Sequence, residues 1–254
     1  MGVRSLARLC DLVWRLSVAN FKLRNEGSYL GIVWHLLNPL LMFATLYAIF
    51  SRNLGSAIPH YPLYLLIGVV QWNFVTLAVG TSLHDILAGR RLIKSLRFSR
   101  ASIVVAAVLT ALFNHVLELV ILIAALPFFG IIPTVALLLP AVLALQFVMV
   151  LGLALGLSSL LLYFRDVDHI WLFVSRLWWF ATPVFYVVTE DASLASVNMV
   201  NPMFHILGIT RGLLLSGVVP SLSAVLVLVA FALLCIIGGY GIFKILEDRF
   251  AEVV

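Results

Sequence analysis

Long stretches without a charged residue dominate the chain. Residues 27–51 contain no Lys, Arg, Asp or Glu, and residues 53–84 form a second uncharged stretch. About 20 consecutive apolar residues are enough for a helix to cross the hydrocarbon core of a bilayer. Only 11% of the residues are charged and the mean hydropathy is +1.15, whereas about 25% of a soluble domain is charged. The sequence therefore predicts an all-α integral membrane protein.

The apolar segments predict six transmembrane helices in a single transmembrane domain, residues 1–254. These helices are expected over 27–51, 63–83, 102–129, 134–164, 170–188 and 221–245. Segment 190–220 fits this scheme poorly, because it carries an Asn-Pro pair and three glycines among apolar residues. Non-helical backbone at membrane depth must be buried in protein or line a wet cavity. We expect this segment to form short re-entrant helices that act as an outer gate.

The distribution of Lys and Arg predicts which ends face the cytoplasm. Of the 16 basic residues, 13 lie before Ser28, within 84–100, at Arg165 or near the C-terminus, only Arg52 and Arg211 lie on the other side, and Arg176 lies within the fifth predicted helix. Cytoplasmic loops carry an excess of Lys and Arg, so both termini are expected in the cytoplasm. The net charge of +5 then belongs to loops near lipid headgroups and does not indicate nucleic acid binding.

The stretch 84–100 is the most basic part of the chain. It contains a single acid, Asp85, and five cations: Arg90, Arg91, Lys94, Arg97 and Arg100. The stretch is too long for a minimal connection, and the spacing of its apolar residues is compatible with a helix. We interpret it as a short cytoplasmic helix that presses on a partner. The alternative is a loop that only fixes topology.

Residues 1–24 predict an amphipathic helix. Arg4, Arg8, Asp11 and Arg15 fall on one side at about 100° per residue, and apolar residues occupy the other. A helix of this kind lies in the membrane interface. It serves either as a lipid anchor alone or also as a contact for a cytoplasmic partner.

Motifs that would indicate an enzyme are missing from the sequence. There is no phosphate-binding G-x-x-x-x-G-K-[ST], no H-E-x-x-H and no G-x-S-x-G. Cys10 and Cys235 suggest neither a disulfide framework nor a metal site. We expect no catalytic residues and no metal. The alternative, a polytopic membrane transferase, would depend on four outward candidates: His60, Glu190, Asp191 and His205.

Two transmembrane segments contain unusual residues. Asn114, His115 and Glu118 share one side of the third segment, and an ionisable group at such depth is a functional candidate. We expect Glu118 to pair between helices, with Arg176 as a possible partner, rather than to move a proton. Residues 163–186 include nine aromatics, some of which fit an interfacial belt. The others could line a path for a polyhydroxylated chain, and we predict that the lining comprises Trp171, Arg176, Trp178, Trp179, Phe180 and Tyr186.

Several ordered motifs resemble those of a known family. The first combines Arg24, Ser28, Leu30, Gly31, Trp34 and Pro39; later come YPLYLLIGVVQWNF, TPVFY at 182–186, and Asn201-Pro202 followed by Arg211. Together they resemble the ABC-2 type permeases that export polysaccharides such as O-antigen, capsule and teichoic acid. The resemblance covers almost the whole chain.

The resemblance implies a function and partners. Such a permease sits in the inner membrane of a bacterium as a homodimer, joins two copies of a separate ATPase subunit that holds ATP and magnesium, and exports a lipid-linked polysaccharide. It also implies an inner gate at Arg24, Ser28, Tyr29 and Trp34, a coupling helix that meets the ATPase through Asp85, Arg90, Arg91, Lys94 and Arg97, and outer gate helices near 192–215. An exporter of a drug or small lipid is the alternative within the family.

Overall fold

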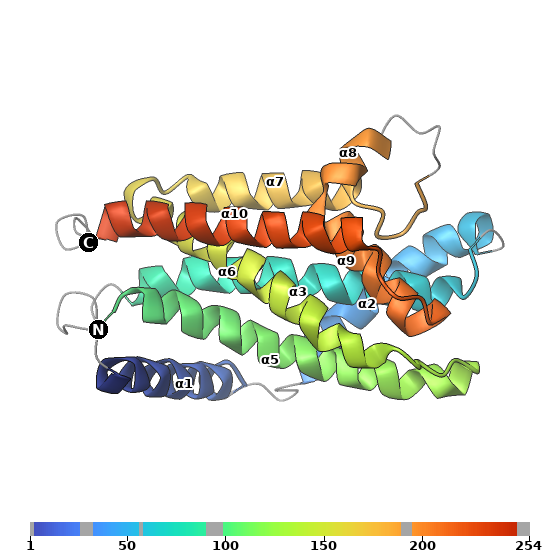
Figure 1. Ribbon diagram of the computed structural model, residues 1–254, viewed down its shortest axis with the longest axis horizontal. Coiled ribbons are helices and arrows are strands. Elements are labelled where there is room, and N and C mark those ends of the chain that lie inside the picture. The colour runs from blue at the N-terminus through green and yellow to red at the C-terminus, as the bar shows by residue number, and fades with distance from the viewer. Residues whose placement is uncertain (1–2, 26–32, 56–57, 90–98, 189–194, 248–254) are drawn as a thin grey trace.

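The computed structural model describes residues 3–25, 33–55, 58–89, 99–188 and 195–247, which form an elongated helical bundle (Figure 1). No strand occurs in these five ranges. The α-helices are α1 (Val3–Asn25), α2 (Val33–Leu54), α3 (Tyr61–Ala88), α5 (Ala101–Ala125), α6 (Leu139–Tyr163), α7 (Val167–Ala181), α8 (Ala195–Val200), α9 (Pro202–Arg211) and α10 (Leu222–Glu247). Short 3-10 helices η1 (Leu126–Phe129) and η2 (Ala136–Leu138) and a π-helical turn η3 (Gly212–Ser216) complete the described structure.

Four of the described helical segments are long and apolar enough to cross a membrane. They are α3, α5 continued by η1, η2 continued by α6, and α10. They coincide with the second, third, fourth and sixth predicted spans. The first predicted span corresponds to α2, which begins at Val33 in the described structure, and the fifth corresponds to α7.

Helix α7 ends earlier than the fifth predicted span. It stops at Ala181 after 15 residues, about 22 Å of helix at 1.5 Å per residue, whereas the prediction extended to Val188. Thr182 is already extended, with φ −93° and ψ 135°, because the ring of Pro183 excludes the helical conformation for the residue before it. The prediction of an uninterrupted fifth span was therefore wrong.

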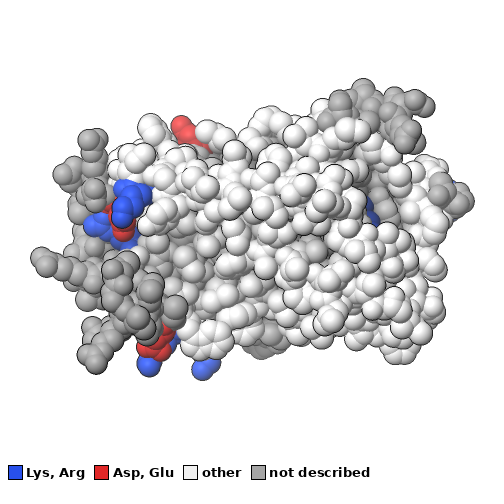
Figure 2. Space-filling model, in the orientation of Figure 1, with Lys and Arg blue, Asp and Glu red and all other residues white. Residues whose placement is uncertain are grey.

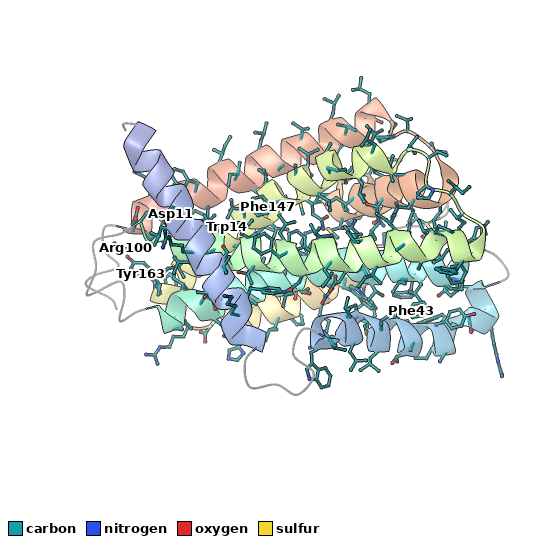
Figure 3. The ribbon with its side chains drawn as sticks, turned by 90° about the horizontal axis from the view of Figure 1, so that it is seen from below. Asp11, Trp14, Phe43, Arg100, Phe147 and Tyr163 are labelled. Atoms are coloured by element: carbon teal, nitrogen blue, oxygen red, sulfur yellow. The ribbon has the colours of Figure 1, made fainter. Side chains whose placement is uncertain are left out.

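Charged side chains gather at one end of the bundle, and the broad flank in view is uncharged (Figure 2). We call this the charged end. Asp11, Arg100 and Tyr163 lie toward it in Figure 3. There the Arg100 guanidinium donates to the carbonyl of Glu247, and the Tyr163 hydroxyl donates to the carbonyl of Leu246 at 2.9 Å. The first turn of α5 and the last turn of α6 thus both hold the end of α10.

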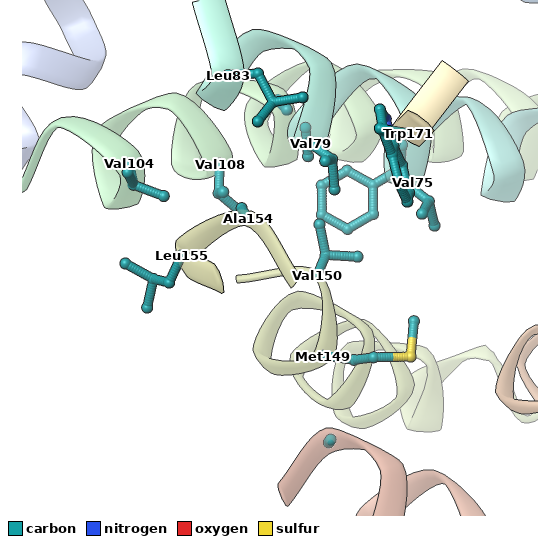
Figure 4. Close-up of a cluster of buried hydrophobic side chains, with 14 of the residues drawn as sticks. Val75, Val79, Leu83, Val104, Val108, Met149, Val150, Ala154, Leu155 and Trp171 are labelled. Carbon is teal, nitrogen blue, oxygen red and sulfur yellow. The ribbon is translucent and has the colours of Figure 1, made fainter. Parts of the chain in front are cut away.

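Helix α3 lies at the centre of the bundle. It packs against α2, α5, α6, α7 and α9. Its residues Val75 and Val79 are fully buried and meet Val108 of α5, Val150 of α6 and Trp171 of α7 in one apolar cluster (Figure 4). Apolar residues surround most of this helix, so neighbouring helices rather than lipid cover it.

Helices α6 and α10 approach each other through glycines. A Cβ atom on Gly152 would overlap the backbone of Cys235, and one on Gly239 would overlap the carbonyl of Gly152. Gly152 and Gly156 form a G-x-x-x-G motif, which lets membrane helices pack backbone to backbone. The motif explains why these two helices make the most extensive helix pair in the structure.

Helix α1 packs against α5 and crosses the bundle obliquely (Figure 3). The hydroxyl of Ser17 donates to the carbonyl of Ala106 at 3.3 Å, and the hydroxyl of Thr110 donates to the carbonyl of Ser17 at 3.2 Å. Trp14 meets Phe113 edge to face, with ring centroids 5.6 Å apart. The helix predicted over residues 1–24 is therefore attached to the bundle by specific polar contacts.

The glycine contact predicts a sharp difference between two neighbouring substitutions. Gly239→Ala should lower the free energy of unfolding by about 1–3 kcal/mol, because its Cβ collides with the backbone of α6. Gly238→Ala is the matched control, since nothing lies within 4 Å of its added Cβ. Thermal unfolding in detergent, followed by size-exclusion chromatography, measures both. Equal melting temperatures for the two variants would contradict the close contact.

Candidate functional site: a groove between α2, α3 and α7

A groove of about 460 Å³ runs between α2, α3 and α7. Both sides mix aromatic and polar residues, and we call the row Thr76, Gly80 and His84 of α3 the polar wall. The lining residues are Met42 of α2; Trp72, Thr76, Gly80 and His84 of α3; and Asp168, Trp171, Leu172, Ser175, Arg176, Trp179 and Phe180 of α7. A site with flat apolar faces opposite polar groups suits a ligand that has both kinds of surface.

Four of the six predicted path residues lie in this groove. Trp171 is almost buried, with 6% of its surface exposed, whereas Phe180 is 56% exposed. Trp179 meets Phe180 edge to face at 4.9 Å. Arg176 is exposed and makes no hydrogen bond or ion pair within the described part of the chain. The groove therefore contains a cation that remains available to a ligand.

Sequence reasoning missed the polar wall. Thr76, Gly80 and His84 recur every four residues, so they share one side of α3, and all three line the groove. Because these residues sit in a stretch with no formal charge, we interpreted them only as part of a span or, for His84, as the start of the basic stretch. Asp168, near the start of α7, also lines the groove. The four-residue spacing was the available signal.

Trp178 and Tyr186 lie outside the groove. Trp178 lines a separate apolar cavity of about 700 Å³ between α6, α7, α8 and α10, and its indole nitrogen donates to Asn201 Oδ1 at 2.9 Å. The Tyr186 hydroxyl donates to the carbonyl of Phe180 at 3.0 Å. In this single chain both side chains hold the segment after α7 in place.

Segment 182–186, the TPVFY motif, is fixed by a set of contacts that we call the outer clamp. Arg211 donates to the carbonyls of Pro183 at 2.9 Å and Val184 at 2.7 Å, and to that of Tyr64 at 3.2 Å. The hydroxyls of Tyr61 and Tyr64 donate to the next two carbonyls, those of residues 185 and 186, at 3.2 and 2.8 Å. Four successive carbonyls thus receive side-chain donors.

The Asn-Pro pair completes the outer clamp. Asn201 caps α9, because its Oδ1 accepts from the backbone N–H of Met203 at 3.1 Å, and Pro202 takes the first helical position. Its Nδ2 donates to the hydroxyl of Thr182 at 2.9 Å. One side chain therefore begins α9 and holds the end of α7.

Arg211 is 8% exposed. Its guanidinium lies 3.4 Å from the centre of the Tyr64 ring, and no carboxylate from the described ranges forms an ion pair with it. Burial lowers the pKa of Arg211 to about 10, and the neighbouring Tyr64 partly opposes this shift. The group is still protonated at neutral pH, so backbone carbonyls and a ring face stabilise its charge.

Glu118 does make a contact between helices, but the partner is not Arg176. Its Oε1 accepts from Asn73 Nδ2 of α3 at 2.9 Å, and its Oε2 lies 3.6 Å from Nδ1 of His115. The expected interhelical contact is present, and the suggested partner was wrong because Arg176 lies in the groove.

Much of the predicted inner gate and coupling helix lies outside the described residues. This applies to Ser28, Tyr29, Arg90, Arg91, Lys94 and Arg97, and to the side chain of Arg24. Among the others, Trp34 is 49% exposed at the start of α2. Asp85 accepts a hydrogen bond from Asn20 of α1 at 3.2 Å.

Of the four candidates for an enzyme, only His60 and His205 lie within the described residues. Glu190 and Asp191 lie outside the described residues, and the Nε2 atom of His205 lies 2.8 Å from the carbonyl oxygen of Met199. In the described ranges no three His, Cys, Asp or Glu residues are placed to hold a metal ion.

Membrane-length helices with an uncharged flank define an integral membrane protein. Residues 11–215 match the family model of the ABC-2 type transporter. The chain belongs to this family, which confirms the resemblance seen in its motifs.

Two individual proteins are similar to the chain over almost its whole length. Over 256 residues the chain is 28% identical to the O-antigen export system permease protein RfbA of Myxococcus xanthus, with 99% of this chain and 98% of the relative covered. A protein of the same name from Klebsiella pneumoniae is 27% identical over 255 residues, covering 98% of this chain and 97% of the relative.

The outer clamp predicts that Arg211 cannot be replaced by another cation. Arg211→Lys should lower the free energy of unfolding by about 2–4 kcal/mol, because one ammonium cannot reach carbonyls that a planar fork reaches together. Arg52→Lys, an exposed position in the last turn of α2, is the control. Thermal unfolding of both variants in detergent measures the difference, and equal stability would exclude the clamp as a stabilising element.

Proposed function

We propose that the chain is the transmembrane subunit of an ATP-driven exporter that moves a lipid-linked, O-antigen-like polysaccharide from the cytoplasm across the inner membrane of a bacterium. ATP and magnesium belong to a separate ATPase subunit, and the assembly is a homodimer with two such subunits. The single observation that carries this proposal is the groove between α2, α3 and α7, which combines aromatic and polar side chains in a member of the ABC-2 family.

The chemistry of the groove supports a sugar polymer. A pyranose ring has apolar faces and a rim of hydroxyls, so it can stack on Trp171, Trp179 or Phe180 while Thr76 and Ser175 exchange hydrogen bonds with it. None of these contacts depends on the identity of the sugar. Such a lining suits a long chain whose successive units must all pass.

The cation in the groove suggests a negative group on the cargo. Arg176 is exposed in the apolar second half of α7, and a charge in such a position is costly unless it serves a function. The diphosphate of a lipid carrier or an acidic sugar would neutralise it through two parallel hydrogen bonds.

The structure on both sides of the basic stretch supports a coupling role. Near the start of this stretch, Asp85 accepts a hydrogen bond from Asn20 of α1. At its end, Arg100 donates a hydrogen bond to the carbonyl of Glu247, at the end of α10. A force applied by an ATPase to residues 90–97 would therefore reach two further helices. In this proposal the stretch is the coupling helix and α1 lies in the cytoplasmic interface.

The same proposal sets the topology. Six segments cross or enter the membrane, with α2 first and α7 fifth, and both termini are cytoplasmic. Helices α8 and α9 are the outer gate helices, and the outer clamp ties them to α3. Arg24, Ser28, Tyr29 and Trp34 form the inner gate, and Trp178 and Tyr186 reach the path if the gate helices move.

An exporter of a drug or small lipid remains the alternative within the family. It would need a narrower path with fewer aromatic residues than this groove has. A membrane transferase is less well supported, because the chain belongs to the ABC-2 type transporter family.

Two substitutions in the groove test the proposal. In vesicles that hold the chain and its co-purified ATPase, the lipid-linked glycan fraction from the native host should stimulate ATP hydrolysis. Phe180→Ala and Arg176→Gln should each raise the glycan concentration for half-maximal stimulation about three- to tenfold, because each removes one contact with the cargo.

Phe173→Ala is the matched control, because Phe173 is an exposed aromatic of the same helix, with 63% exposure, and does not line the groove. Its glycan response should equal that of the wild type. An unaltered response in both groove variants would exclude the groove as the path, and a wild-type complex that ignores glycan would argue against polysaccharide export.

Charge reversal in the basic stretch tests coupling. Exchanging Arg90, Arg91 and Lys94 for glutamate should reduce glycan-stimulated ATP hydrolysis at least tenfold without lowering the melting temperature, because the partner then meets the wrong charge. Lys244→Glu, an exposed position in the last turn of α10 at the same end, is the control. Normal coupling in the triple variant would contradict the docking role.

A further inference from the structure

A second polar site lies beside the groove, between α3 and α5. Asn114, His115 and Glu118 of α5 are only 1%, 1% and 4% exposed. They lie within a helix long enough to cross the membrane, where polar and ionisable groups are costly and usually serve a function. Neither the groove lining nor the outer clamp includes any of them.

Glu118 and His115 contact two successive residues of α3, Asn73 and Phe74. The carboxylate of Glu118 accepts from Nδ2 of Asn73 at 2.9 Å. The ring of His115 stacks on that of Phe74, with centroids 4.8 Å apart and an angle of 14° between the planes. The hydrogen bond is directional and the stacked rings share a large contact area. Together they fix the rotation of α3 about its axis at Asn73 and Phe74.

Asn73 is half-buried and bonded to this cluster, and it is not itself a lining residue of the groove. It precedes Thr76, Gly80 and His84 by three, seven and eleven residues. This spacing keeps all four on one side of α3, and the last three line the groove. Asn73 therefore lies one turn beyond the polar wall, on the same side of α3.

Glu118 also determines which atom Asn73 presents to the open side. Its Oε1 accepts from the amide nitrogen of Asn73, which leaves the carbonyl oxygen of that amide directed elsewhere. No donor from the described ranges reaches that oxygen. The result is a fixed acceptor beside the groove.

We propose that Asn73 is a further contact residue of the glycan path, accepting hydrogen bonds from sugar hydroxyls through Oδ1, and that Glu118 is the positioning residue that orients it. This inference rests on the proposed function of the groove. It assigns the cargo side a hydrogen-bond donor, such as the hydroxyl groups of a polyhydroxylated chain.

The experiment uses the vesicles described above, with the host's lipid-linked glycan fraction as the probe. Asn73→Leu removes the acceptor but also leaves Glu118 without its donor. The double variant Asn73→Leu/Glu118→Leu avoids that penalty, because replacing both partners of a buried hydrogen bond by apolar groups costs little stability. Both should raise the half-saturating glycan concentration about three- to tenfold, with an unchanged maximal rate.

Glu118→Gln tests the positioning role. Glutamine can accept or donate, so it no longer selects one orientation of the Asn73 amide, and the half-saturating concentration should rise about twofold or more. Because Glu118 acts through Asn73, the same change should have no further effect when Asn73 is already leucine. Asn114→Leu, one turn away in the same cluster, should alter melting temperature only.

The results of these experiments distinguish a failure of this inference from a failure of the proposed function. A folded double variant with wild-type glycan response would overturn the inference and leave the proposed function intact. An additive effect of Glu118→Gln on the Asn73→Leu background would overturn the positioning role. A wild-type complex that glycan does not stimulate would overturn the proposed function, and this inference with it.

Discussion

The need of every buried backbone carbonyl for a hydrogen-bond donor is the constraint on which the rest of this structure depends. Pro183 ends α7 after 15 residues and thereby releases a run of carbonyls from helical hydrogen bonding. Arg211 and two tyrosines of α3 supply the missing donors. The broken helix is stable only because a buried cation and α3 are already in place beside it.

Helix α3 joins the separate parts of the molecule. Its first turns hold the segment that follows α7, its middle provides the polar wall of the groove, and its last turn meets α1 at Asp85. A rotation of this one helix would alter all three regions together. The hydrogen bond between Glu118 and Asn73 lies next to the part of α3 that lines the groove, so it opposes a rotation that would change the groove lining.

The sequence predicted the long helices well, because a charge-free run of sufficient length has few other folds available. It also contained the signal for the end of α7, since Pro183 is visible in it, but hydropathy continued past that point and concealed the break. The polar wall was missed because Thr76, Gly80 and His84 carry no full charge and do not interrupt an apolar run. The partner of Glu118 could not be predicted, because periodicity shows which residues share a side of a helix but not which helix lies opposite.

The glycine contact between α6 and α10 has a mechanical consequence. With Gly152 against the backbone of α10 and Gly239 against α6, the two cylinders interlock and neither can slide along the other without separating first. Arg100 grips the tip of α10 at one end of this pair, and η2, which leads directly into α6, touches η3 at the far end. A displacement of the end of α10 near Arg100 would therefore move α6 and α10 together as one rigid body. The displacement would reach η3 undiminished, because the two helices do not slide past each other.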